Sequence, residues 1–338
     1  METEASLSEP VQARRRSSSF SDDYSVQKTN DDASQSKLAA VQLNYWKDDF
    51  LKRFVAMTSE DGKVVHRDPE ISLGYWTRVT VIRQFVDDFL AKAGEGAQII
   101  SIGCGFDTLF WRLKSEGAKF ARFIEVDFSS VTAKKIRVIR RPGANVLTNE
   151  FSQPIEESHH TDLHAGDYHL IGADLRQWAE LQAKLELANI DWSAPTLIIA
   201  ECVLIYMAVS QSEELLANIT KHFTNVALLS YEQTNVGDDF GRVMAANLEK
   251  RGLKLPGMPA CESLDTQKER LIQAGFTHGT IESMHTVFQK RMPPQERKRV
   301  LAIEHLDEME LLQQLNEHYS ISMAVKTAAE EHYGLPSF

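Results

Sequence analysis

Short apolar runs alternate with segments of helical spacing through the middle of the chain. The runs lie between residues 97 and 233 and read AQIISIG, FARFIEVDF, YHLIGADL, APTLIIAECVLIYM and NVALLSYEQ. Between them, segments such as SSVTAKKIRVIRR and SQSEELLANITKHF space apolar residues three and four positions apart, as an amphipathic helix does. Strands that are apolar almost throughout are typical of a parallel sheet covered by helices on both faces. The pattern therefore predicts an α/β fold.

Several details refine this prediction. Ser210 and Glu213 have the spacing of a capping box and would begin the helix before the fifth strand. Residues 144–166 lack a clear period and are expected to form a long surface loop. Beyond the fifth strand, residues 238–258 and 263–276 have helical spacing, 276–283 and 318–326 resemble closing strands, and 293–318 reads as a helix with proline at its start.

Helices are also expected before the first strand. In the segment LGYWTRVTVIRQFVDDFLAKAG, Val79, Ile82, Val86 and Phe89 lie on one helical face. We predict one domain over residues 37–330, divided into an N-terminal helical lid (37–95), a cofactor-binding core (96–232), a helical insertion at the substrate region (233–275) and closing strands with a helix (276–330). The helices outside the core either form a pocket over the strand ends or merely cover the sheet, and we favour the pocket. Residues 331–338 would be a C-terminal tail.

Residues 1–36 differ in composition from the rest. Nine of them are serine and few are large and apolar, so the segment buries too little surface to offset its ordering entropy. We expect a disordered tail there.

Composition and charge exclude several classes of function. The 338 residues carry a net charge of −11 and no long basic tract, which disfavours nucleic acid as a partner. No apolar run approaches the roughly 18 residues of a membrane span, and no signal peptide is evident. The three cysteines are scattered, which is typical of a reducing cytosolic or nuclear setting, and we expect a cytoplasmic location. We expect a monomer that contacts neither membrane nor nucleic acid.

Acidic residues or glycines follow each predicted strand, where ligands of parallel sheets bind. The positions are Gly103, Gly105 and Asp107, then Glu125 and Asp127, then Asp174, then Glu201, then Glu232. A dinucleotide fingerprint would need a third glycine at position 108, which holds Thr108. A cofactor that carries adenosine and an amino acid but no phosphate fits better, and S-adenosylmethionine is such a cofactor.

Each of these positions suits one part of that cofactor. Asp127 or Glu125, 24 and 22 residues after Gly103, could bind the ribose hydroxyls. Asp174 could accept a hydrogen bond from the adenine amino group, with the backbone N–H of Leu175 on a ring nitrogen. Glu201 could meet an ammonium group.

Motifs spread over residues 37–330 resemble the leucine carboxyl methyltransferase family. They read LNYWKDDFLKRFV, LGYWTRV, GCGFDTLFWRL, FIEVDF, IGADLR, LIIAECVLIYM, YEQTNVGDDFGRVMAANL, LDTQKERLIQAGF and HLDEMELL. The resemblance implies a Rossmann-like S-adenosylmethionine-dependent methyltransferase fold with N-terminal helices and an inserted helical lid or substrate region. It implies cofactor contacts from Lys37, Arg78, Gly103, Asp127, Asp174, Leu175 and Glu201. It also implies an enzyme that methylates the C-terminal leucine of the type-2A protein phosphatase catalytic subunit and so regulates phosphatase assembly. A relative in the family acts on transfer RNA and carries a β-propeller, and the absence of propeller repeats here favours the phosphatase-directed member.

The expected reaction needs positioning more than acid–base chemistry. A C-terminal carboxyl group has a pKa of about 3.3–3.7 and is ionised at neutral pH, so no general base is required. Arg78 suits a carboxylate, either of the cofactor's methionine or of the substrate or both, and Tyr206 could orient the substrate carboxylate. We therefore name Arg78 and Tyr206 as catalytic candidates.

Three alternatives remain at this point. The chain could methylate a small-molecule carboxylate or hydroxyl, or bind the phosphatase without catalysis. His159, His160, Asp162 and His164 could ligate zinc, but no second motif supports a metal, and we expect none.

Overall fold

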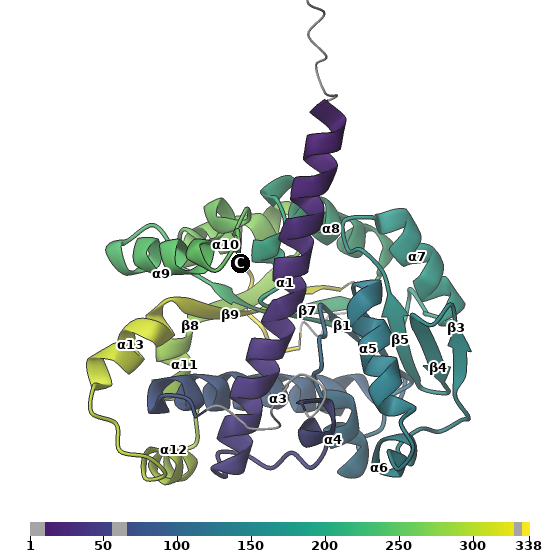
Figure 1. Ribbon diagram of the computed structural model, residues 1–338, viewed down its shortest axis with the longest axis horizontal. Helices are drawn as coiled ribbons and strands as arrows, with labels where there is room; N and C mark the ends of the chain where they lie inside the picture. The colour runs from purple at the N-terminus through teal and green to yellow at the C-terminus, as the bar shows by residue number, and fades with distance from the viewer. Residues whose placement is uncertain (1–10, 56–65, 328–332) are drawn as a thin grey trace, which may run out of the picture.

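A computed structural model describes residues 11–55, 66–327 and 333–338. Its nine-stranded sheet has the order β3-β4-β5-β2-β1-β6-β7-β9-β8 (Figure 1). The five central strands are parallel, and they are β5 (Tyr168–Gly172), β2 (Arg122–Asp127), β1 (Gln98–Ile102), β6 (Thr196–Glu201) and β7 (Val226–Gln233). These are the five strands predicted from the apolar runs. Antiparallel strands extend both edges, with β4 (Asp162–Ala165) and β3 (Glu156–Ser158) on one side and β9 (Tyr319–Lys326) and β8 (His278–Ser283) on the other. The predicted α/β class is confirmed.

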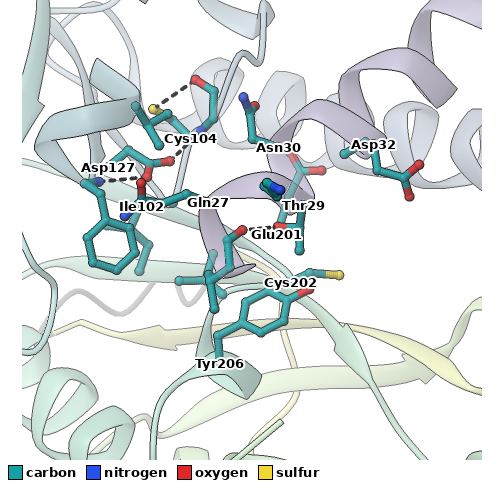
Figure 2. Close-up of a pocket in the computed structure, with 18 of the residues that line it drawn as sticks. Gln27, Thr29, Asn30, Asp32, Ile102, Cys104, Asp127, Glu201, Cys202 and Tyr206 are labelled. Atoms are coloured by element: carbon teal, nitrogen blue, oxygen red, sulfur yellow. Dashed lines mark hydrogen bonds between the residues drawn. The ribbon is translucent and has the colours of Figure 1, made fainter. Parts of the chain in front are cut away.

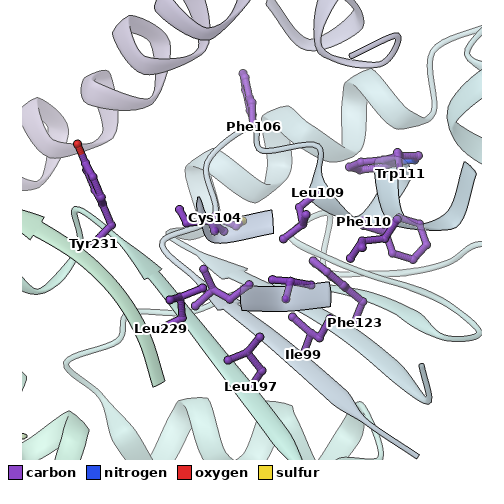
Figure 3. Close-up of a cluster of buried hydrophobic side chains, with 14 of the residues drawn as sticks. Ile99, Cys104, Phe106, Leu109, Phe110, Trp111, Phe123, Leu197, Leu229 and Tyr231 are labelled. Carbon is purple, nitrogen blue, oxygen red and sulfur yellow. The ribbon is translucent and has the colours of Figure 1, made fainter. Parts of the chain in front are cut away.

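Alternate residues of the central strands enter two hydrophobic cores. Ile99 and Phe123 belong to one core and Ile100 and Ile124 to the other, as the two-residue period of a strand requires. The first core is closed by α3 (Pro69–Ala93), α4 (Leu109–Ser115), α5 (Ser129–Ile139) and α11 (Met284–Lys290), and the second by α7 (Trp178–Leu187), α8 (Val209–His222) and α10 (Leu264–Gln273). Figure 3 shows the first core, where Phe110 and Trp111 of α4 pack over the strands. Both faces of the sheet are therefore covered, which explains the uninterrupted apolar runs.

The disordered tail was expected over residues 1–36, of which 1–10 lie outside the described residues. Residues 11–36 are helical instead. Helix α1 spans Val11–Gln42 and runs across the molecule in Figure 1. From Asp22 onward it is anchored by polar contacts with the body of the protein. One example is the hydrogen bond from the backbone N–H of Phe106 to the Asn30 side chain at 2.7 Å. The prediction was wrong because it counted apolar surface alone, whereas this helix is held by hydrogen bonds and ion pairs.

Residues 144–166 are also more ordered than expected. The segment contains α6 (Asn145–Thr148) and the strands β3 and β4, and β4 pairs with β5. Leu163 and Ala165 are buried, and the intervening His164 is only partly so, a short alternation that the polar surroundings obscured. The prediction of a long loop is therefore wrong.

Two helix boundaries differ from expectation. Helix α8 begins at Val209, and the side chain of Gln211 accepts a hydrogen bond from the backbone N–H of Ala208 at 3.0 Å, so Ser210 and Glu213 do not form the capping box. The segment 293–318 is divided into α12 (Pro294–Leu301) and α13 (Met309–Glu317).

The remaining elements are α2 (Leu51–Val55), α9 (Asp239–Lys250) and the 3-10 helices η1 (Leu204–Tyr206) and η2 (Met258–Cys261). Within the described ranges, no helix combines the length and apolar character needed to cross a membrane.

Candidate functional site

A cavity of about 500 Å³ lies at the carboxyl ends of the parallel strands, with α1 along one wall. Figure 2 shows Thr29 of α1 near Glu201 and Tyr206, while Asn30 of the same helix lies on the side of Cys104 and the glycine turn. All eight residues expected at the site line this cavity, namely Lys37, Arg78, Gly103, Asp127, Asp174, Leu175, Glu201 and Tyr206. The structure thus brings together side chains from six separate stretches of the chain. Their individual roles stay predictions.

The glycine turn after β1 leaves no room for side chains. Gly103 and Gly105 have φ angles of +61° and +50°. A Cβ atom on Gly103 would lie 2.5 Å from a methyl carbon of Val203, and one on Gly105 would lie 2.4 Å from the side-chain oxygen of Asn30. Glycine is therefore required at both positions by conformation and by space, and the bare backbone of Gly103 forms part of the cavity wall.

Two cations and two carboxylates alternate at the centre of the cavity. The Nζ atom of Lys37 lies 2.7 Å from Asp107 and 3.7 Å from Glu201, and Nε of Arg78 donates to Glu201 at 2.6 Å. The four side chains are 11–15% exposed. Burial opposes the charge on Lys37 and Arg78, but the neighbouring carboxylates outweigh it and raise the pKa of both groups. Burial likewise opposes ionisation of Asp107, yet Lys37 and Arg112 lower its pKa. Lys37, Arg78 and Asp107 are thus charged at neutral pH.

The guanidinium of Arg78 is also held by aromatic rings. Its central carbon lies 4.5 Å from the ring centroid of Tyr231 and 5.7 Å from that of Tyr75. Tyr231 in turn stacks on Tyr319 with centroids 5.2 Å apart. Because Glu201 binds Nε, the terminal nitrogens of Arg78 remain available for an anion in the cavity, apart from a long contact of 4.0 Å to the sulfur of Cys202. A planar cation fixed on two sides is suited to bind a carboxylate in one orientation.

Asp127 stands beside the glycine turn. Its two carboxylate oxygens accept hydrogen bonds from the backbone N–H groups of Gly105 and Phe128, both at 2.7 Å. Burial raises the pKa of Asp127, and these two hydrogen bonds limit the rise. The other candidate for the ribose, Glu125, does not line the cavity. It is buried behind the turn, 2.6 Å from both Lys135 and the hydroxyl of Tyr168. Of the two acids, only Asp127 lines the cavity, and its contact with a ribose stays a prediction.

Asp174 is engaged by an arginine that the sequence analysis did not select. Arg176 binds both oxygens of Asp174, and its terminal nitrogens each donate at 2.9 Å to Asp23 of α1. All three residues line the cavity. Asp23 was missed because it lies in the segment expected to be disordered. Arg176 had one signal, its place in the motif IGADLR, directly after Leu175.

A buried carboxylate holds the turn that carries Tyr206. One oxygen of Glu232, at the end of β7, accepts hydrogen bonds from the backbone N–H groups of Val203 and Leu204 at 2.9 and 2.8 Å. These residues lead into η1, whose last residue is Tyr206. Burial raises the pKa of Glu232 and also raises that of Tyr206 well above its ordinary value. The phenol of Tyr206 is therefore a neutral hydrogen-bonding group within the cavity.

The model of the leucine carboxyl methyltransferase family matches residues 24–220. The chain is 50% identical to leucine carboxyl methyltransferase 1 of Caenorhabditis elegans over 93% of its length and 95% of that protein. It is 38% identical to leucine carboxyl methyltransferase 1 of Bos taurus, over 96% and 97% of the two chains. The chain belongs to the leucine carboxyl methyltransferase family. The predicted family and the predicted enzyme class, a methyltransferase, are confirmed.

A solved structure supports the fold. A protein from Thermobifida fusca YX that is classed as a methyltransferase superposes with a TM-score of 0.53 at 14% identity, over 87% of this chain and 94% of that one. The two chains therefore share their overall architecture.

For a member of this family, the residues in the cavity fit S-adenosylmethionine as the methyl donor. The side-chain-free turn at Gly103 admits close approach of a ligand, Asp127 lies next to it, and Asp174 with Leu175 follows on the neighbouring strand. The cations Lys37 and Arg78 lie beside the carboxylate of Glu201 in the same cavity, and their binding to the methionine part of the cofactor stays a prediction. Within the described part of the chain, no group of three or more His, Cys, Asp or Glu residues is arranged to hold a metal ion.

Proposed function

We propose that the chain methylates the C-terminal leucine carboxylate of the type-2A protein phosphatase catalytic subunit and thereby regulates phosphatase assembly. The observation that carries this proposal is the pairing of a fixed guanidinium, Arg78, with a neutral phenol, Tyr206, in one cavity. An ionised carboxylate can be bound and oriented by such a pair. The names of the relatives, leucine carboxyl methyltransferase 1, support a leucine carboxylate as the methyl acceptor.

The reaction requires no proton transfer. When bound, S-adenosylmethionine supplies an electrophilic methyl carbon on a positively charged sulfur. The terminal carboxylate, oriented by Arg78 and Tyr206, would accept this methyl group through one oxygen, and the electron pair of the broken carbon–sulfur bond would leave with S-adenosylhomocysteine. The products are the methyl ester and S-adenosylhomocysteine.

The residues of the chain would act by holding the reactants in line. Arg78 and Lys37 attract carboxylates into the cavity, and Tyr206 donates one hydrogen bond to the substrate carboxylate. The second oxygen of that carboxylate is then left free to attack. Helix α1 forms one wall of the cavity and would limit the access of water. Alignment of this kind accelerates bimolecular reactions strongly without acid–base chemistry.

We also propose where and in what form the chain acts. All three cysteines are free thiols, which agrees with a reducing cytoplasm. We propose that the chain acts there as a monomer, and that its partner is the C-terminal tail of the phosphatase subunit.

One experiment separates this function from its alternatives. The purified chain is incubated with methyl-labelled S-adenosylmethionine and the phosphatase catalytic subunit, either intact or lacking its terminal leucine. We expect label only on the intact subunit, and we expect mild alkali to release it, as from a methyl ester. Equal labelling of both forms would contradict the proposed substrate. Binding without any release of S-adenosylhomocysteine would indicate a non-catalytic phosphatase-binding protein.

A further inference from the structure

The cavity extends past the cofactor-binding positions. Across the sheet, the strands run in the order β5, β2, β1, β6, β7 and β9. The lining follows the same order, with Asp174 after β5, Asp127 at β2, Gly103 after β1 and Glu201 at β6. Further lining residues come from β7, from β9 and from the segment after β7. The cofactor positions thus occupy one end of the cavity, and the other end is left for the methyl acceptor.

The lining at this second end is partly apolar. It includes Leu248 of α9 and Leu253 of the loop that follows α9, and these pack with Val26 of α1, which lies one helical turn from Asp23. The three side chains belong to a small hydrophobic cluster that is separate from the two main cores. Leu253 is buried, whereas Val26 and Leu248 are partly exposed at the cavity. An apolar wall with accessible side chains is a surface on which an aliphatic group can be desolvated.

Tyr206 connects this wall to the reaction site. It lines the cavity and also packs against the same cluster. In a C-terminal residue the carboxylate and the side chain are attached to one Cα atom. A group that orients the carboxylate must therefore stand next to the surface that receives the side chain.

We propose that Val26, Leu248 and Leu253 form the subsite for the isobutyl side chain of the substrate's terminal leucine. The inference rests on the proposed function and assigns its side-chain specificity to named residues. The isobutyl group has no polar atoms, so contact with three aliphatic side chains satisfies it fully. Removal of even one methylene from a substrate in an apolar pocket lowers kcat/KM by about 10- to 200-fold. The unmodified chain should therefore prefer terminal leucine to terminal alanine by about 100-fold or more.

The test measures substrate preference rather than activity alone. The substrates are the phosphatase catalytic subunit with its terminal leucine and the same subunit ending in alanine. Leu248→Ala should reduce the ratio of the two kcat/KM values by about tenfold, chiefly through the leucine substrate. Its Kd for S-adenosylhomocysteine should stay within about twofold of the unmodified value, because Leu248 is not among the residues expected to bind the cofactor. The matched control is Val243→Ala on the same helix, since Val243 is 60% exposed and does not line the cavity.

A second variant guards against an effect on folding. Leu248→Phe adds volume to the subsite and should lower kcat/KM for the leucine substrate more than for the alanine substrate. An unchanged leucine-to-alanine ratio in both Leu248 variants, with normal S-adenosylhomocysteine binding, would overturn the subsite. Failure of the unmodified chain to label the leucine-ended subunit would instead overturn the proposed function, and the subsite with it.

Discussion

Lys37 of α1 and Asp107, which follows the glycine turn, form an ion pair with a nitrogen–oxygen distance of 2.7 Å. The two side chains are 11% and 14% exposed, so solvent screens them little. The other oxygen of Asp107 accepts a hydrogen bond from the backbone N–H of Leu109 at the start of α4. One carboxylate therefore joins the helix that covers the cavity to the turn that forms its floor.

Replacement of Asp107 by asparagine should weaken cofactor binding. The variant keeps an oxygen for Leu109 but loses the negative charge that holds Lys37. A hydrogen bond to a charged group contributes about 1.5–3 kcal/mol, so we expect the Kd for S-adenosylhomocysteine to rise by about 10- to 100-fold. Isothermal titration calorimetry measures the change. Asp49→Asn is the control, because Asp49 pairs with Lys47 at an exposed position, and an equal loss in both variants would argue against a local role for Asp107.

Arg78 should be indispensable for methyl transfer. Removal of one fixed donor from an active site typically costs about 100- to 1000-fold in rate, and we expect a loss of this size in kcat/KM for Arg78→Ala. Arg78→Lys should recover only part of it, because an ammonium group keeps the charge but lacks the planar fork. Circular dichroism and a thermal melt establish that the variants are folded. Near-normal turnover of a folded Arg78→Ala protein would refute the assigned role.

The parallel core and most of its ligand-facing residues could be predicted from the sequence because they depend on local patterns. Strands β1, β2, β5, β6 and β7 are buried on both faces, which produces an apolar run in each. Parallel strands end at one edge, so the residues that follow them, such as Asp127 and Glu201, necessarily converge. The acids and glycines at the ends of the apolar runs were therefore enough to predict where the cavity lies.

Contacts between distant polar segments could not be predicted in this way. The hydrogen bond of Asn30 with the glycine turn and the ion pair of Asp23 with Arg176 each join α1 to a far part of the chain. Neither leaves a periodic signal, and a serine-rich composition suggests disorder. Glu125 and Asp127 lie two residues apart in β2 and therefore point to the same face of the sheet. Asp127 ends the strand and lines the cavity, whereas Glu125 lies further back and pairs with Lys135, a difference that the sequence spacing could not show.

The bridge from Asp23 through Arg176 to Asp174 should slow cofactor release. It links α1 to the end of the cavity where we expect adenine. Without this link, the N-terminal part of α1 would be held less firmly against the cavity. The side chains of Arg176 and Asp23 are 22% and 26% exposed, and a pair of this exposure contributes up to about 1 kcal/mol. Asp23→Asn should therefore raise the Kd for S-adenosylhomocysteine by about fivefold, through faster dissociation in stopped-flow measurements. Asp22→Asn is the matched control, since Asp22 pairs with Lys254 on the outside. Equal dissociation rates in the two variants would show that the bridge does not restrain the cofactor.

The rate of methyl transfer should not vary between pH about 6 and about 9. The substrate carboxyl group has an ordinary pKa of about 3.3–3.7 and is fully ionised throughout this window. Burial raises the pKa of Tyr206 well above 10, so the phenol keeps its proton, and the nearby carboxylates raise the pKa of Lys37 and Arg78 above their ordinary values, so both stay cationic. Since no group that contacts the reacting carboxylate changes charge, single-turnover rates should be flat.

Tyr206→Phe provides the control for this pH profile. It should lower the rate by removal of one hydrogen bond while the profile stays flat, because the phenol acts as a neutral donor. A general base would produce a different result, a tenfold rise per pH unit up to its pKa in the unmodified chain. If the rate rises with pH in the unmodified chain and this rise disappears in Tyr206→Phe, then Tyr206 acts as a general base and not as a positioning group.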